Sequence, residues 1–127
     1  MTYNKPFKFL KNLPKKLNSF YKKHSKFSFK VDNKSKTIKD FDPVTNIDRG
    51  FEKYIRSLIH KSFPNDSIIG EEFEDKFSSN DYQWCIDPID GTRAFIIGAP
   101  TWSNLIGLSF KDKSVLGLAN FPELNKY

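Results

Sequence analysis

The 127-residue sequence predicts a single α+β domain in which two N-terminal helices pack on a largely antiparallel sheet. Two long segments repeat apolar residues every three or four positions, as amphipathic helices do. The later segments are short, rich in Ile, Val, Leu and Phe, and separated by turn residues, which is typical of strands. Thirteen Phe and two Trp residues supply a large buried area, although only 38% of the residues are apolar.

The first helix is expected over residues 6–23. Its apolar positions fall on one face and are Phe7, Leu10, Leu13, Leu17, Phe20 and Tyr21. Pro14 should kink or restart this helix, because proline has no backbone N–H to donate. Beyond the helix, Phe27, Phe29 and Val31 alternate with polar residues and predict a strand.

The second helix is expected between Thr45 and Phe63, after a polar connection. Thr45 is a favourable N-cap, and Asp48 occupies the third helical position, as the acid of a capping box does. An apolar stripe follows, made of Ile47, Phe51, Tyr54, Ile55, Leu58 and Ile59. The Phe-Pro-Asn sequence that starts at Phe63 should end the helix.

The sheet is expected to come from the remaining segments. They predict strands over residues 67–69, 82–86, 105–110 and 115–121, a short helix over 93–97 and a hairpin turn over 111–114. The strand that begins at Tyr82 should stop at Asp87, where the chain turns. Cys85 lies in the middle of this strand and is expected to be a buried structural thiol. As the single cysteine, it excludes an internal disulfide and a zinc site built from cysteines.

Charge divides the chain into a basic and an acidic part. Residues 1–39 carry 12 lysines and one acid, a net charge of +11, whereas residues 40–127 carry a net charge of −5. A polyanion-binding module is one interpretation of the basic part, but a solvated lysine-rich face is favoured over it. No run of ~18 apolar residues and no leader is visible. We therefore expect a cytoplasmic protein whose partners include neither a membrane nor a nucleic acid.

The sequence DPIDGT at residues 87–92 is the most informative acidic motif. Pro88 favours an extended Asp87, and two carboxylates three positions apart across a turn can point to the same side. Gly91 permits a positive φ or the close approach of a ligand. Thr92 then begins a helix, where backbone N–H groups favour an anion. The residues leave two interpretations open, a metal-assisted phosphate site and a surface turn with a helix cap.

Glu71 extends this motif if the two preceding strands are neighbours in the sheet. The Gly-Glu-Glu segment at residues 70–72 follows a strand end, so Glu71 would join Asp87 and Asp90 in a cluster of three carboxylates. Such a cluster repels itself unless a cation neutralises it. Taken alone, paired glutamates are more often a solvated loop, and Asp48 needs no role beyond capping its helix.

Together these segments resemble the inositol monophosphatase superfamily of metal-dependent phosphatases. Three motifs carry the resemblance: DPVTNID at residues 42–48, GEE at residues 70–72 and WCIDPIDGT at residues 84–92. The stretch RAFIIGAPTW at residues 93–102 is most similar to the histidinol-phosphatase-type branch. The resemblance implies that residues 1–127 form the N-terminal half of the sugar-phosphatase (αβαβα) fold.

The resemblance also implies a set of metal ligands. Glu71, Asp87 and the carbonyl oxygen of Ile89 would hold a first Mg²⁺. Asp87 and Asp90 would help to hold a second, and the complete enzyme would use two or three ions. Hard oxygen donors of this kind are the ligands that Mg²⁺ prefers in proteins.

The catalytic roles follow from the same resemblance. Thr92 and Glu71 would orient the attacking water, and Asp48 would bind the Thr92 hydroxyl. The backbone N–H groups of Gly91 and Thr92, together with Asp90, would bind the substrate phosphate. The expected substrate is a small phosphorylated alcohol such as histidinol phosphate or inositol phosphate, hydrolysed without a covalent intermediate. A homodimer is compatible with the full-length form.

The chain departs from the pattern of the family in one respect. Members of the family are longer, and their second half supplies a further Asp ligand in a Trp-Asp pair, which this sequence lacks. The predicted function is therefore that of a Mg²⁺-dependent phosphomonoesterase represented by its N-terminal half. The alternatives are an inactive truncated fragment that binds metal or phosphate weakly, and the lysine-rich polyanion-binding module.

Overall fold

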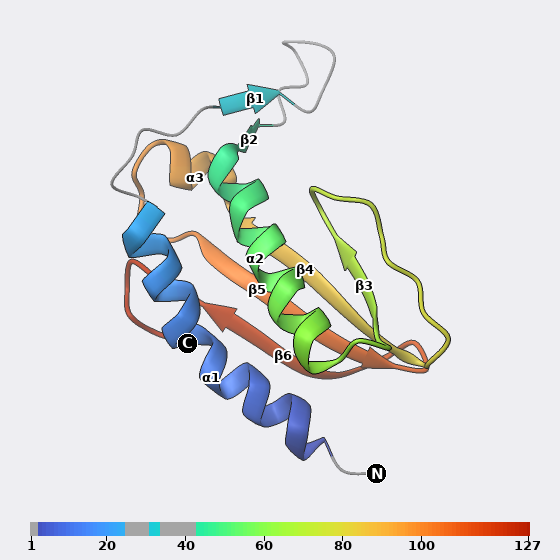
Figure 1. The fold of residues 1–127 in the computed structure, drawn as a ribbon. Helices are drawn as coiled ribbons and strands as arrows, with labels where there is room; N and C mark the ends of the chain where they lie inside the picture. The colour runs from blue at the N-terminus through green and yellow to red at the C-terminus, as the bar shows by residue number, and fades with distance from the viewer. Residues whose placement is uncertain (1–2, 25–30, 34–42) are drawn as a thin grey trace.

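The computed structural model describes residues 3–24, 31–33 and 43–127, and its fold is α+β as predicted. In chain order the elements are α1 (Asn4–His24), β1 (Val31–Asn33), β2 (Pro43–Thr45), α2 (Asn46–Ser62), β3 (Ser67–Gly70), β4 (Tyr82–Asp90), α3 (Thr92–Ile96), β5 (Ser103–Phe110) and β6 (Lys113–Asn120). Helices α1 and α2 cover one face of a four-stranded sheet, while β1 and β2 pair separately near the start of α2 (Figure 1). The predicted strand positions Phe27 and Phe29 lie outside the described residues.

The four-stranded sheet has the order β3-β4-β5-β6 and is largely antiparallel, as predicted. Strand β5 pairs antiparallel with β4 and β6, whereas β3 and β4 are parallel. The β5–β6 hairpin turns through Lys111 and Asp112, whose φ angles of 48° and 63° are those of a tight two-residue turn. The turn is therefore shorter than the predicted one over residues 111–114, and β6 already begins at Lys113.

Strand β4 is longer than predicted. It does not stop at Asp87 but continues to Asp90, which pairs with Ser103 of β5. The pairing is irregular between Asp87 and Asp90, where Pro88 can donate no ladder hydrogen bond. The carbonyl oxygen of Pro88 instead accepts a hydrogen bond of 2.7 Å from Asn104 Nδ2. A side chain of β5 thus maintains the contact between the two strands through the acidic motif.

Helix α1 is one element that continues through Pro14, so of the two predicted effects, a kink or a restart, the restart does not occur. Leu10, Leu13 and Leu17 surround the proline and are buried in the core. Burial of each leucine side chain contributes about 1.5–3 kcal/mol to the free energy of unfolding. The three contributions together exceed the cost of about 3 kcal/mol for a proline inside a helix. Among the described helices, none is both long and apolar enough to cross a membrane.

Helix α2 begins and ends as predicted. Thr45 is its N-cap, and the capping box with Asp48 is complete. Thr45 Oγ1 accepts a hydrogen bond of 3.1 Å from Asp48 N, and Asp48 Oδ1 accepts one of 3.2 Å from Thr45 N. The helix ends at its C-cap, Phe63. This rigid start fixes the position of the Asp48 carboxylate.

The core lies between the two long helices and one face of the sheet. Trp84, Ile86 and Ile106 belong to the same buried cluster as the leucines and isoleucines of α1 and α2. Successive residues of a strand point to opposite faces, so Cys85 points away from the helices and is exposed, not buried as predicted. In the described part of the chain, that second face carries an open hollow of about 670 Å³.

Candidate active site

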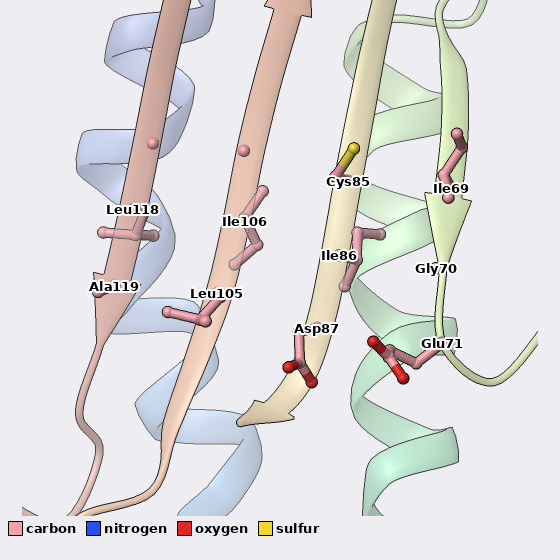
Figure 2. Close-up of a pocket in the computed structure, with 12 residues that line it drawn as sticks. Ile69, Gly70, Glu71, Cys85, Ile86, Asp87, Leu105, Ile106, Leu118 and Ala119 are labelled. Carbon is pink, nitrogen blue, oxygen red and sulfur yellow. The ribbon is translucent and has the colours of Figure 1, made fainter. Parts of the chain in front are cut away.

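Two of the predicted acidic residues meet at one end of the sheet. Strands β3 and β4 are parallel neighbours, and Gly70 pairs with Ile86 in their register. The next residues, Glu71 directly after β3 and Asp87 within β4, therefore lie side by side where β3 ends. Figure 2 shows the Glu71 side chain directed toward Asp87, and both line the hollow on the open face of the sheet. This pair of carboxylates is the centre of the candidate site.

The structure does not bring the third predicted carboxylate, that of Asp90, into the same group. Across the described ranges, no three Asp, Glu, His or Cys side chains are grouped so that they could hold one metal ion. Asp90 is exposed at the end of β4, outside the lining of the hollow. The prediction assumed a turn directly after Asp87, but the strand continues there. Between Asp87 and Asp90 the register of β4 against β5 shifts, so that three steps along β4 match two steps along β5.

Asp48 contacts both the helix that it caps and the acidic motif. Its Oδ1 also accepts a hydrogen bond of 2.5 Å from Thr45 Oγ1. Its Oδ2 accepts one of 3.1 Å from Thr92 Oγ1, at the start of α3. The side chain is only 1% exposed, so these partners, not bulk water, hold its carboxylate. Capping and contact with Thr92 therefore occur together, because the two oxygens have different partners.

The acidic motif turns into α3 at Gly91. This residue has a φ of 85°, a left-handed conformation that glycine adopts readily, as the sequence predicted. The hydroxyl of the next residue, Thr92, lies 3.2 Å from the Ile89 carbonyl oxygen as well as within hydrogen-bond distance of Asp48. A hydroxyl has one hydrogen, so it donates to one acceptor at a time and its oxygen can still accept.

Glu52, a buried acid near the site, was not predicted from the sequence. Its side chain is 0% exposed. Its Oε1 accepts a hydrogen bond of 2.9 Å from Glu72 N, and its Oε2 accepts bonds of 3.0 Å from Phe73 N and from Arg56 Nε. The signal in the sequence was helical spacing: Glu52 lies four residues after Asp48, so both acids share one face of α2.

The donor atoms of the site fit a hard divalent cation. Glu71 and Asp87 offer carboxylate oxygens from adjacent strands. Magnesium prefers oxygen ligands and retains several of its waters, so a pair of carboxylates is compatible with one such ion. Among the residues that line this hollow no imidazole occurs, but the exposed Cys85 thiol, two residues before Asp87 on β4, is a softer donor.

The fold is shared with phosphatases of known structure. A Staphylococcal IMPase-I complexed with products superposes with a TM-score of 0.84 over 98% of this chain and 46% of that chain, at 18% identity. An IMPase from Thermotoga maritima superposes with a TM-score of 0.72 over 87% of this chain and 41% of that chain, at 34% identity. The chain therefore has the fold of a part of these phosphatases and covers less than half of each.

The chain belongs to the inositol monophosphatase family, whose sequence profile matches residues 7–127. The histidinol-phosphatase of Chlorobaculum parvum is 46% identical over 88 residues, which are 69% of this chain and 34% of that protein. The chloroplastic bifunctional phosphatase IMPL2 of Arabidopsis thaliana is 43% identical over 89 residues, 68% of this chain and 26% of that protein. The predicted family is confirmed, and the matched segments cover 34% and 26% of the length of these two relatives.

Proposed function

We propose that residues 1–127 are the N-terminal, cation- and phosphate-binding part of a phosphoric monoester hydrolase that acts on histidinol phosphate. The juxtaposition of Glu71, at the end of β3, with Asp87 of the parallel strand β4 is the observation that carries the proposal. The substrate is proposed from the relatives named histidinol-phosphatase, from Chlorobaculum parvum and from Mycobacterium tuberculosis, which are 46% and 35% identical to this chain.

In this proposal, Glu71, Asp87 and the carbonyl oxygen of Ile89 hold a first Mg²⁺. Asp87 and Asp90 contribute to a second ion, whose remaining ligand comes from the second half of the enzyme, and the complete site uses two or three ions. When bound, these ions supply Lewis acidity, which activates a water molecule and neutralises charge on the phosphate. The carboxylates in turn fix where that chemistry takes place on the edge of the sheet.

Thr92 and Glu71 orient the attacking water in the proposed mechanism. While the Thr92 hydroxyl donates its hydrogen to Asp48 Oδ2, its oxygen accepts a hydrogen bond from the water and aims it at phosphorus. The backbone N–H groups of Gly91 and Thr92, which have no intrahelical acceptor at the start of a helix, bind the phosphate, and Asp90 would act on it through the cation that it helps to hold. The water oxygen bonds to phosphorus, the ester P–O bond breaks, one proton of the water leaves with the alcohol, and the other remains with the inorganic phosphate.

Phosphate release from a C-terminally extended protein tests this function. The chain is joined at Tyr127 to the corresponding second half of the Chlorobaculum parvum histidinol-phosphatase and assayed with histidinol phosphate and inositol 1-phosphate. We expect Mg²⁺-dependent turnover with histidinol phosphate modestly preferred, and a loss of about 100-fold or more in Glu71→Gln and Asp87→Asn. The matched control Asp75→Asn changes an exposed acid of the loop after β3 and should retain activity. Turnover that does not depend on Mg²⁺, or that is unchanged in both Glu71→Gln and Asp87→Asn, contradicts the proposal.

A further inference from the structure

We propose that Glu52 is a positioning residue for Glu71. Its buried carboxylate holds the turn that follows β3, and thereby sets where the Glu71 carboxylate lies relative to Asp87. The inference rests on the proposed function only in treating Glu71 as a cation ligand. We call the hydrogen bonds that Glu52 accepts from Glu72, Phe73 and Arg56 the clamp. They are properties of the fold and can be tested separately.

The clamp acts on the C-terminal side of Glu71. A buried carboxylate is costly unless hydrogen bonds satisfy it, and Glu52 receives three. Two come from the main-chain N–H groups of Glu72 and Phe73, the two residues directly after Glu71, at 2.9 and 3.0 Å. The third comes from Arg56 Nε at 3.0 Å. The main chain after Glu71 is therefore tied to α2 by a charge-assisted pair of hydrogen bonds.

The same carboxylate also packs against the N-terminal side of Glu71. A Cβ atom placed on Gly70 would lie 2.5 Å from Glu52 Oε1 and 2.7 Å from Oε2. These oxygens cannot easily move aside, because the hydrogen bonds of the clamp hold them. Gly70 is therefore required for the close approach of Glu52 to the backbone. Glu71 is thus fixed on both sides, by the strand end and by the clamped amides.

Arg56 extends the clamp by one further residue. Its Nη1 donates to the carbonyl oxygen of Glu74 at 2.9 Å, and its Nη2 donates to that of Phe73 at 3.2 Å. Arg56 and Glu52 are four residues apart on α2, and the arginine side chain is only 16% exposed. One helical turn before Glu52, Asp48 binds Thr92. Helix α2 therefore presents one carboxylate to each part of the site, and its rigidity fixes their separation.

Mn²⁺ binding by the 127-residue chain tests the positioning role, because Mn²⁺ takes the same carboxylate and carbonyl ligands as Mg²⁺. Free Mn²⁺ is measured by electron paramagnetic resonance. We expect Glu71→Gln to lose binding and Glu52→Gln to weaken it about 10-fold, as for other residues that hold a metal ligand in place. Gly70→Ala would push against the Glu52 carboxylate without changing any charge. It should weaken Mn²⁺ binding to a similar extent. The control Glu74→Gln removes an exposed carboxylate of the same loop and should bind as the unmodified chain does.

Hydrogen exchange at the amides of Glu72 and Phe73 provides the second readout and needs no metal. These amides should exchange faster in Glu52→Gln and in Gly70→Ala, while the amides between β4 and β5 keep their protection. Unchanged exchange in both variants, or unchanged Mn²⁺ affinity in both, overturns the positioning role. If the unmodified chain does not bind Mn²⁺, or Glu71→Gln binds it equally well, the proposed function is overturned instead. In that case the exchange rates at Glu72 and Phe73 still test whether Glu52 holds the turn after β3.

Discussion

Thr92 Oγ1 lies 3.1 Å from Asp48 Oδ2, although the two residues are 44 positions apart in the sequence. The other carboxylate oxygen of Asp48 completes the capping box of α2 with Thr45. One side chain therefore joins the start of a helix to the turn that carries the acidic motif. Under the proposed function, stability and activity should both depend on this carboxylate, and variants are needed that affect the two separately.

Asp48→Asn should separate catalysis from capping in the C-terminally extended protein. We expect kcat to fall about 100-fold, because an amide does not hold the Thr92 hydroxyl as a carboxylate does. The free energy of unfolding should fall by only about 1 kcal/mol, the usual value of a cap. Thr45→Ala is the matched control, since it removes the cap and leaves Thr92 bound: stability should fall about equally, with kcat near that of the parent. Equal losses of kcat in both variants would favour a purely structural role for Asp48.

Substitution of Thr92 tests the hydroxyl itself. Thr92→Val keeps the shape of the side chain but removes the hydroxyl, so the extended protein should lose about 100-fold or more in kcat with little change in KM. Thr92→Ser retains the hydroxyl and should recover most of the activity. Steady-state phosphate release with histidinol phosphate measures both variants. A serine variant as slow as the valine variant would show that the hydroxyl is not the operative group.

The hydrogen bond from Asn104 to Pro88 should contribute measurably to stability. Asn104 Nδ2 donates to the Pro88 carbonyl oxygen at 2.7 Å, and Asn104 Oδ1 accepts a bond of 3.1 Å from Asn120 Nδ2. Both asparagines are fully buried, so Asn104→Ala should lower the free energy of unfolding by about 1–3 kcal/mol. Urea denaturation measures this loss. Asn12→Ala, at an exposed position of α1, should change stability by no more than about 0.5 kcal/mol, and a similar small effect at Asn104 would contradict the prediction.

Cys85 should report whether another layer covers the open face of the sheet. Its thiol is exposed beside the hollow of about 670 Å³, so it should react rapidly with a thiol reagent in the 127-residue chain. In the extended protein we expect slower labelling, less self-association and the onset of turnover, because the added half covers this apolar face. Equal labelling rates in the two proteins would place the added half elsewhere.

Robust Mg²⁺-dependent turnover by the short chain, lost in Asp90→Asn, would show that the second half is dispensable.

The sequence by itself determined the features that depend on neighbouring residues. The capping box of Thr45 and Asp48 closes within three positions, and the apolar stripe of α2 repeats with the helical period, so both could be predicted. The left-handed Gly91 was predictable for the same reason, because a turn inside a short motif limits which residue fits. Motif order and spacing were sufficient to indicate the family, which the match over residues 7–127 confirms.

Only the tertiary structure decided which distant groups meet. The parallel pairing of β3 with β4 brings Glu71 beside Asp87, and the support of Asn104 lets β4 continue past Asp87 to Asp90. Burial of Glu52 could not be read from its own segment, because its partners lie in a loop 20 or more positions later. Such contacts depend on strand order, register and the packing of a helix on a sheet. Local propensity and periodicity carry no information about these long-range choices, so the geometry of the site was settled only when the chain folded.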